Sequence, residues 1–416
     1  MKENRTLEFK EEITNTFLKT VSAYANYDGG TVLFGIADDG KITGIENPQQ
    51  ACLDIENRIN DSITPQPDYT LSIQKENRIV ALTVKGGINK PYLYKSKAYK
   101  RNDTATIEVD TLEFTRLVLE GKHIYYEELP SDTQELSFST LGERLKNVTG
   151  IVDFDKDVLK TLNLYSDQNG FHNAAAILAD KNEFPGIDIA RFGENISIIQ
   201  KRVTFENMSI ISAYEKSLEI YRDYYQYEKI TGSVRENIEI IPEAAFREAI
   251  ANALIHRLWD VKTQIRVSMF DDKIEIVSPG GLPTGISEKE YLAGRISVLR
   301  NPILANVLYR LKIVEIFGTG ILRIMQNYEG SLRKPSFEVS DNMIKVVLPV
   351  MEMQPNLTAD EKAIYRLLSS NISKSISEIM PYVEFGKTKA SKILKAMTER
   401  GIVKVEGTGR GTKYHL

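Results

Sequence analysis

An apolar run at residues 31–36 is followed by Asp38-Asp39-Gly40, and this pattern constrains the fold of the chain most strongly. It predicts a buried strand that ends in a tight turn. Residues 3–10 alternate Leu7 and Phe9 with polar residues, which predicts another strand. Between the two, apolar residues recur at helical spacing up to an Asp-Gly-Gly stop at residues 28–30. We therefore expect a strand, a helix and a strand, with acidic residues at two strand ends.

Acidic side chains in this unit suggest a metal site. Glu8 and Lys10 are two residues apart, so a strand places both on one face. Glu3 can join them only if the chain bends at residues 4–6. Glu3, Glu8 and Asp38 around one point could hold a hard divalent cation, with Lys10 beside a phosphate, as in metal-assisted phosphodiester cleavage. The alternative is that these are solvated charges on edge strands.

A family resemblance supports the first interpretation. Residues 1–110 resemble the AlbA-type domain of the Schlafen family through E-x-x-x-x-E-F-K at 3–10, AYANYDGG at 23–30 and LFGIADDGKITGI at 33–45. The resemblance implies a catalytic carboxylate set at Glu3, Glu8 and Asp38 with Lys10 beside it and Mg²⁺ or Mn²⁺ as the metal. Asp39 is the rival of Asp38 for the aspartate position.

A basic and aromatic segment follows at residues 90–104, and YKRNDT at 99–104 matches a further element of the same family. Tyr99, Lys100 and Arg101 could contact a nucleic-acid backbone and stack on bases. The alternative is an edge strand that its lysines protect from pairing.

Composition narrows the class of protein. The 416 residues have 42% hydrophobic and 26% charged residues and a net charge of −4, which predicts a globular protein of several domains. The single cysteine, Cys52, excludes intrachain disulfides and cysteine-rich zinc sites, and it suits a reducing cytoplasm. We expect no signal peptide, because the start MKENRTLEFK has no apolar h-region, and no membrane span, because no apolar run reaches 18 residues.

Residues 121–155 read as a connector with little structure of their own, and residues 156–350 alternate helix and strand patterns. In the helix expected at 241–259, Glu248 and Asn252 fall on one stripe. These stretches resemble the GHKL ATPase superfamily, most closely a RecG-like branch, from about 168 to 349. That resemblance implies that Glu248 activates water, that Asn252 holds magnesium, and that ATP lies along two glycine loops, Gly280-Gly281 and Gly318-Thr319-Gly320. Ser278-Pro279 stands where ATP-binding relatives have an adenine-reading aspartate, so a degenerate module for dimerisation or allostery is the alternative, and we expect a homo-oligomer.

The C-terminal residues 356–416 show helix, helix, helix and a two-stranded wing, the order of a winged helix-turn-helix. Residues 358–416 contain 11 Lys and Arg against 6 Asp and Glu, while the remaining chain is net negative. Nucleic-acid contacts should therefore concentrate here, and the candidate residues are Lys387, Lys389, Lys392, Arg410 and Lys413. The alternative is a winged helix that contacts protein.

Together these patterns predict a multidomain α/β (α+β) protein with an AlbA-type domain at 1–120, a GHKL-like α/β sandwich at 156–350 and a winged helix. The favoured function is a metal-dependent endonuclease that acts on RNA more than on DNA and is regulated through the GHKL-like module; host regulation and phage defence are both open as its role. The first rival is a non-catalytic DNA-binding transcriptional regulator in the cytoplasm. The second rival is an ATP-dependent conformational switch.

Overall fold

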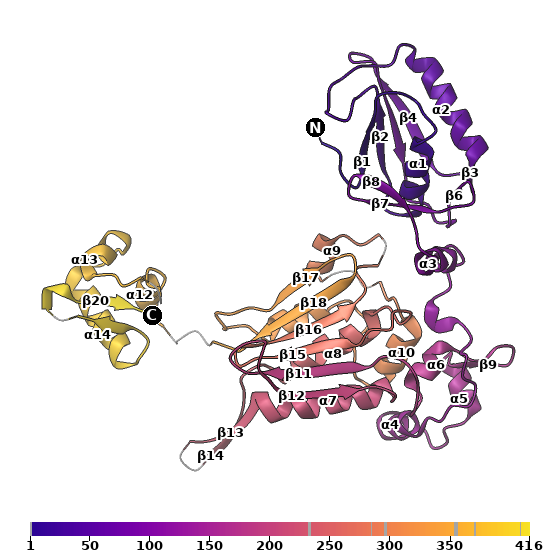
Figure 1. Cartoon of the computed structure of the whole chain (residues 1–416). Coiled ribbons are helices and arrows are strands. Elements are labelled where there is room, and N and C mark those ends of the chain that lie inside the picture. The colour runs from indigo at the N-terminus through magenta and orange to yellow at the C-terminus, as the bar shows by residue number, and fades with distance from the viewer. Residues whose placement is uncertain are drawn as a thin grey trace. The chain divides into compact units, whose positions relative to one another are not determined.

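The computed structural model describes residues 2–231, 234–283, 285–294, 298–352, 357–369, 372–407 and 409–416, and it leaves out the side chains of Thr231, Val234 and Arg410. The fold is a mixed α+β fold with several sheets (Figure 1). The chain divides into two compact units. One comprises Met1–Asn327 with Pro335–Pro349, and the other comprises Tyr328–Lys334 with Val350–Leu416.

The N-terminal part of the first unit is built on a four-stranded sheet in the order β1-β2-β5-β4. The predicted strand, helix and strand are confirmed as β1 (Leu7–Lys10), α1 (Phe17–Asn26) and β2 (Gly30–Phe34). β1 and β2 pair in parallel, which requires the crossover that α1 supplies. The antiparallel strands are β4 (Tyr69–Gln74) and β5 (Ile79–Val84).

Two apolar clusters sandwich this sheet. One cluster joins α1 and α2 (Pro48–Ser62) to inward residues such as Val32, Val80 and Leu82. The other gathers Phe9 and Leu33 with Ile36, Ile79 and Ala81. Both faces of the central strands β2 and β5 are therefore buried. β1 lies at an edge of the sheet, but its residues Glu8 and Phe9 are buried, so Glu8 is not a solvated charge. The remaining elements here are β3 (Ile63–Thr64), β6 (Leu93–Tyr94), β7 (Tyr99–Asn102), β8 (Ala105–Glu108) and α3 (Thr111–Gly121).

The expectation of a weakly structured connector at 121–155 is wrong. This region holds η1 (Tyr126–Glu128) and α4 (Ser139–Thr149), and the helix begins where Asp180 accepts hydrogen bonds from Ser139 N and Thr140 N. Phe138 packs with Phe154 and Phe171 at ring-centroid distances of 6.4 and 5.5 Å. The sequence hides this order because the apolar residues come from separate short elements: α5 (Lys156–Thr161), β9 (Tyr165–Ser166), β10 (Gly170–Phe171) and α6 (Asn173–Leu178).

A six-stranded sheet in the order β12-β11-β15-β16-β18-β17 forms the centre of the first unit. Helices α7 (Ile210–Tyr225) and α8 (Glu243–His256) pack against each other and against this sheet, giving a layer of helices on a layer of strands (Figure 1). The strands are β11 (Ile187–Phe192), β12 (Ile199–Phe205), β15 (Ile265–Met269), β16 (Lys273–Pro279), β17 (Ser336–Val339) and β18 (Met343–Pro349). Further elements are β13 (Gln226–Thr231), β14 (Val234–Glu239), α9 (Glu288–Leu292), α10 (Pro302–Arg310) and α11 (Gly320–Gln326).

The second unit has the predicted order of three helices and a hairpin. α12 (Ala359–Tyr365) begins with a capping box formed by Thr358 and Glu361. The third helix, α14 (Lys387–Glu399), buries Ala390, Leu394 and Met397 in the core of this unit. The hairpin strands are β19 (Lys404–Glu406) and β20 (Lys413–His415). The shorter elements are α13 (Ile376–Ile379), η2 (Met380–Tyr382) and η3 (Gly409–Gly411).

Candidate functional site

The carboxylate of Glu8 lies buried on β1 with cations on both oxygens. Lys10 Nζ lies 2.6 Å from Oε1, and Arg101 Nη1 donates a hydrogen bond to Oε2. Thr20 on α1 donates a further hydrogen bond to Oε2, at 2.8 Å. Only 4% of Glu8 is exposed. Because a buried carboxylate is stable only when it is paired and hydrogen-bonded, these three partners account for its position.

Glu3 reaches the same strand through the predicted bend. Asn4 Oδ1 accepts a hydrogen bond from Thr6 N at 2.9 Å, which turns the chain ahead of β1. Glu3 Oε1 then accepts a hydrogen bond from Phe9 N at 2.7 Å. One oxygen of Glu3 is thus committed to the backbone of the strand that carries Glu8.

The aspartates lie on an exposed turn. Asp39 Oδ1 accepts a hydrogen bond from Lys41 N at 2.8 Å, an interaction that shapes the turn, and Asp38 is exposed. Within the described residues no three His, Cys, Asp or Glu side chains are grouped so as to hold a metal ion. The structure therefore does not bring Glu3, Glu8 and Asp38 together as a ligand set. Lys10 and Arg101 occupy the oxygens of Glu8 that Mg²⁺ or Mn²⁺ would need, so the residues as arranged do not fit the metal.

The expectation that the 90–104 segment presents aromatic rings to bases is wrong. Tyr99 is 7% exposed and belongs to the core around α1, and Arg101 is 8% exposed. Lys100 pairs with Glu113 on α3. Arg101 Nη1 also donates to Thr106 Oγ1 at 2.9 Å, and Nη2 donates to the Asn4 carbonyl at 3.2 Å. The three candidates therefore hold β7, β1 and α3 together. No pattern in the sequence indicates these contacts, because the partners lie far away in the chain or on another element.

Glu248 and Asn252 lie beside the second glycine turn. Asn252 Nδ2 donates a hydrogen bond to Glu248 Oε1 at 3.3 Å. A Cβ atom at Gly320 would stand 2.6 Å from each of these two atoms, so the ends of the Glu248 and Asn252 side chains would have to shift if another residue replaced this glycine. Burial raises the pKa of the Glu248 carboxyl, and Arg323 opposes that effect. The buried hydroxyl of Thr319 has no hydrogen-bond partner.

The first glycine loop packs against protein. Gly280 has a φ of +105°, and a Cβ there would meet Arg300 Nη1 at 2.7 Å and Leu258 at 2.8 Å. Gly281 lies against the backbone at Ser340 and Asp341. Ser278 is buried and donates a hydrogen bond to the Ala253 carbonyl at 3.0 Å. The structure thus joins Glu248 and Asn252 to Gly320, whereas Gly280 and Gly281 serve close packing around Arg300, a residue that sequence analysis missed.

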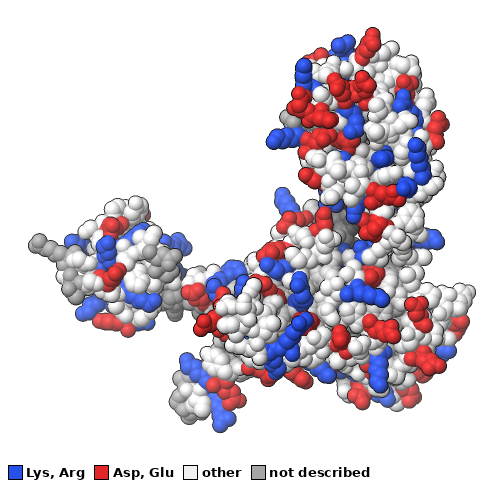
Figure 2. Space-filling model, viewed as in Figure 1, with Lys and Arg blue, Asp and Glu red and all other residues white. Residues whose placement is uncertain are grey.

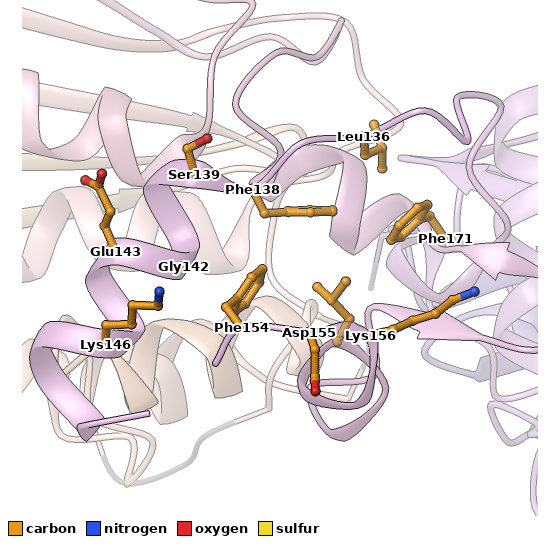
Figure 3. A pocket seen from close by; sticks show the side chains of 11 residues that line it. Leu136, Phe138, Ser139, Gly142, Glu143, Lys146, Phe154, Asp155, Lys156 and Phe171 are labelled. Carbon is orange, nitrogen blue, oxygen red and sulfur yellow. The ribbon is translucent and has the colours of Figure 1, made fainter. Parts of the chain in front are cut away.

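The aromatic cluster of the former connector lines a cavity of about 500 Å³ between α4, α5 and β10 (Figure 3). Phe138, Phe154 and Phe171 form its walls, while Lys146 and Lys156 stand toward opposite ends. The Asp155 carboxylate at its edge accepts hydrogen bonds from Asp157 N and Val158 N and so caps α5. None of the predicted site residues lines this cavity.

Basic side chains follow the outward side of α14 in the second unit. Lys387, Lys392 and Lys395 are exposed, opposite the buried Ala390, Leu394 and Met397. Lys389 Nζ lies 2.5 Å from Asp360 on α12, so it holds two helices together as well as facing solvent. Lys413 is exposed on β20, and the side chain of Arg410 lies outside the described part of the chain. Figure 2 shows basic and acidic side chains interspersed over the visible face of the molecule.

Comparison with known families agrees with two of the expected resemblances. Residues 3–110 match the family described as "Schlafen, AlbA_2", and residues 262–348 match the family described as "Putative ATP-dependent DNA helicase recG C-terminal". The chain therefore carries a Schlafen/AlbA_2 domain and a RecG-like domain of the ATPase type. These two domains relate the chain to nucleic-acid proteins.

Solved structures and curated proteins add little to this. The crystal structure of the DIP2311 protein from Corynebacterium diphtheriae is 20% identical, with a TM-score of 0.48, and the match covers 99% of this chain and 92% of that one. The solution structure of the N-terminal domain of a RecG-related protein from Nitrosomonas europaea is also 20% identical, with a TM-score of 0.20, covering 26% of this chain and 83% of that one. No curated protein matches the chain. Among the described residues, no helix is long and apolar enough to cross a membrane.

Proposed function

We propose that the protein is a non-catalytic, nucleic-acid-binding regulator that contacts duplex DNA through its C-terminal unit. In this proposal the unit is a winged helix-turn-helix, α14 is the recognition helix, and β19 and β20 form the wing. The observation that carries the proposal is the row of exposed lysines on α14, which lies opposite a complete apolar core. Such a row neutralises phosphates while the buried face keeps the helix in place.

The buried cluster around Glu8 favours regulation over cleavage. A nuclease of the predicted type needs carboxylate oxygens free to bind a metal. Lys10 and Arg101 engage both oxygens of Glu8, and Asp38 is on an exposed turn. These contacts give Glu8 a structural reason to be present without any reaction, so the metal-dependent endonuclease becomes the second candidate.

Salt-dependent binding to duplex DNA tests the main proposal. A protein that neutralises four to six phosphates should lose roughly 10²–10³ in affinity between about 50 and 200 mM salt. Replacing Lys387, Lys392 and Lys395 with Gln should weaken binding and reduce the slope of log K against log [salt] by about one per lost contact. The control replaces Lys75 and Lys85, two exposed lysines that lie in the turn after β4 and directly after β5. A larger loss in the control than in the α14 variant would transfer DNA binding to the N-terminal domain.

The endonuclease has its own discriminating assay. Purified protein is incubated with Mn²⁺ or Mg²⁺ and a mixed panel of RNA and DNA, beside a Glu8→Gln variant. The regulator proposal expects equal, background cleavage in both. Metal-dependent cleavage that disappears in Glu8→Gln would instead establish the nuclease.

Nucleotide binding is a further candidate, favoured by the approach of Gly320 to Glu248 and Asn252. In that case Asn252 and Glu248 would hold magnesium and orient water, and the glycine turn would contact phosphates. Calorimetry with ATP and magnesium tests it. If no heat of binding is measured at millimolar ATP, this region does not bind the nucleotide and has a structural role only.

A further inference from the structure

A second cavity, of about 490 Å³, lies in the first unit beside the C-terminal end of α8. Three arginines contribute to its lining, Arg116 from α3, Arg257 after α8, and Arg300 before α10. Trp259, the single tryptophan of the chain, also lines it, with the guanidinium carbon of Arg257 4.2 Å from its ring centroid. Gly281 of the first glycine loop belongs to this lining, whereas Glu248, Asn252 and Gly320 do not, so the cavity adjoins one of the candidate nucleotide contacts but is not lined by the others.

The lining contains more arginines than carboxylates that are free to pair with them. Arg116 is paired with Asp260 through two hydrogen bonds, of 2.6 and 3.0 Å. Arg257 and Arg300 instead donate to backbone carbonyls, which carry no net charge. The other acids of the lining are already paired, Glu113 with Lys100, Glu120 with Lys90 and Asp341 with Arg5.

The two central arginines are destabilised as cations. Burial lowers the pKa of Arg257 to about 10. Burial also lowers the pKa of Arg300 to about 10, and the nearby charge of Arg116 lowers it further. Asp260 opposes both shifts. Because Arg257 is fully buried, an anion in the cavity would contact Arg116 and Arg300 and would stabilise the charge of Arg257 only from a distance.

We propose that this cavity binds a small phosphate-bearing ligand of mononucleotide size. Arginine is the side chain best suited to phosphate, since its planar donors match the oxygens and its charge is retained when partly buried. Ile124, Tyr126 and Leu258 supply apolar surface for the rest of the molecule. This site is independent of DNA binding by α14 and goes beyond the proposed function.

Intrinsic fluorescence of Trp259 measures the binding directly, because Trp259 is the single tryptophan of the chain and lines this cavity. The full chain is titrated with AMP and, separately, with inorganic phosphate, against sodium chloride of equal ionic strength. We expect a saturable change with both, and tighter binding of AMP because it also covers the apolar wall. A change with AMP alone would assign recognition to the base and sugar and overturn the phosphate assignment.

Two substitutions that should change the affinity for AMP in opposite directions make the result specific. Arg116→Gln removes a cation and should weaken binding about tenfold. Asp260→Asn removes the carboxylate that accepts two hydrogen bonds from Arg116. Arg116 is then free to contact the ligand, so binding should become severalfold tighter. Damage to the fold weakens binding in both variants, so opposite signs cannot arise from misfolding.

The matched control is Arg202→Gln. Arg202 on β12 donates two hydrogen bonds to Asp188 on β11, as Arg116 does to Asp260, and neither residue belongs to the lining of this cavity. This substitution should leave the dissociation constant for AMP unchanged. The proposal is overturned if neither AMP nor phosphate changes the fluorescence beyond the chloride control. Equal weakening in Arg116→Gln, Asp260→Asn and Arg202→Gln would overturn it as well.

Discussion

The guanidinium of Arg101 donates a hydrogen bond to the carboxylate of Glu8, and the two residues lie 93 positions apart in the chain. Their side chains are 4% and 5% exposed. The pair joins β7 to β1, while Lys10 completes the neutralisation of Glu8 from the same strand. Glu8, which the family resemblance suggests as a catalytic carboxylate, therefore has a structural role: its pairing with Arg101 links β1 to β7.

The first prediction concerns this pair. Arg101→Gln should lower the free energy of unfolding of the N-terminal domain by about 3 kcal/mol, because it leaves Glu8 buried with one cation fewer. Urea unfolding followed by circular dichroism measures the change. The exposed pair of Lys85 and Asp68 provides the control, since Lys85→Gln should cost less than about 1 kcal/mol. Equal effects of the two substitutions would contradict a stabilising role for Arg101.

Gly320 supplies the second prediction. Gly320→Ala places a methyl group 2.6 Å from atoms of Glu248 and Asn252, so these side chains must move apart. We expect a loss of roughly 1 kcal/mol and a decrease in the melting temperature of a few degrees, measured by differential scanning fluorimetry. Gly411→Ala is the control, because no atom lies within 4 Å of the added methyl. An unchanged melting temperature in Gly320→Ala would contradict this prediction and would show that Glu248 and Asn252 move aside at little cost.

The third prediction follows from the buried carboxyl of Glu127. Its two oxygens accept hydrogen bonds from Ile303 N and Leu304 N at 2.5 and 2.9 Å, at the start of α10. Burial raises the pKa of Glu127 to about 8, although the two N–H groups oppose this. The folded state therefore holds a proton that the unfolded chain releases near pH 4.5, so this contribution to stability is present at low pH and is lost as the pH rises to about 8.

A Glu127→Gln variant separates this effect from other titrations. The stability of the wild type relative to Glu127→Gln should fall between about pH 5 and 8, by at most about 1.4 kcal/mol per pH unit. Melting temperatures of both proteins across this range measure it. A difference that stays constant, or that rises with pH, would show that the hydrogen bonds outweigh burial.

The fourth prediction uses the contact of Lys389 with Asp360. Asp360→Asn removes a negative charge beside α14 and releases Lys389, so duplex DNA should bind about two- to fivefold more tightly at low salt. Glu384→Gln removes an exposed acid of the same unit that has no such contact with α14 lysines in the described structure, and serves as the comparison. Tighter binding in Glu384→Gln alone would place the DNA on another side of this unit.

Local patterns in the sequence predicted the first strand and helix and the helices of the C-terminal unit, but they missed the elements of residues 121–155. The alternation in 3–10, the helix at 17–26 and the three C-terminal helices depend on residues a few positions apart, and the structure confirms them. The burial of Tyr99 and Arg101 depends on Glu8 and α1, so their charge and aromaticity suggested exposure. Likewise, Arg300 fills the space beside Gly280, and no spacing in the sequence links the two.

Neighbouring strands β16 and β18 hydrogen-bond along their length, although α9, α10, α11 and β17 intervene between them in the chain. Both ends of this excursion are fixed in the sheet, and the entropic cost of closing a longer loop grows only slowly with its length. β17 itself pairs with β18, so the sheet uses the last part of this excursion. Changes of length therefore disturb the sheet least in the helical stretch between β16 and β17, and new specificities can arise there while the strand pairing is kept.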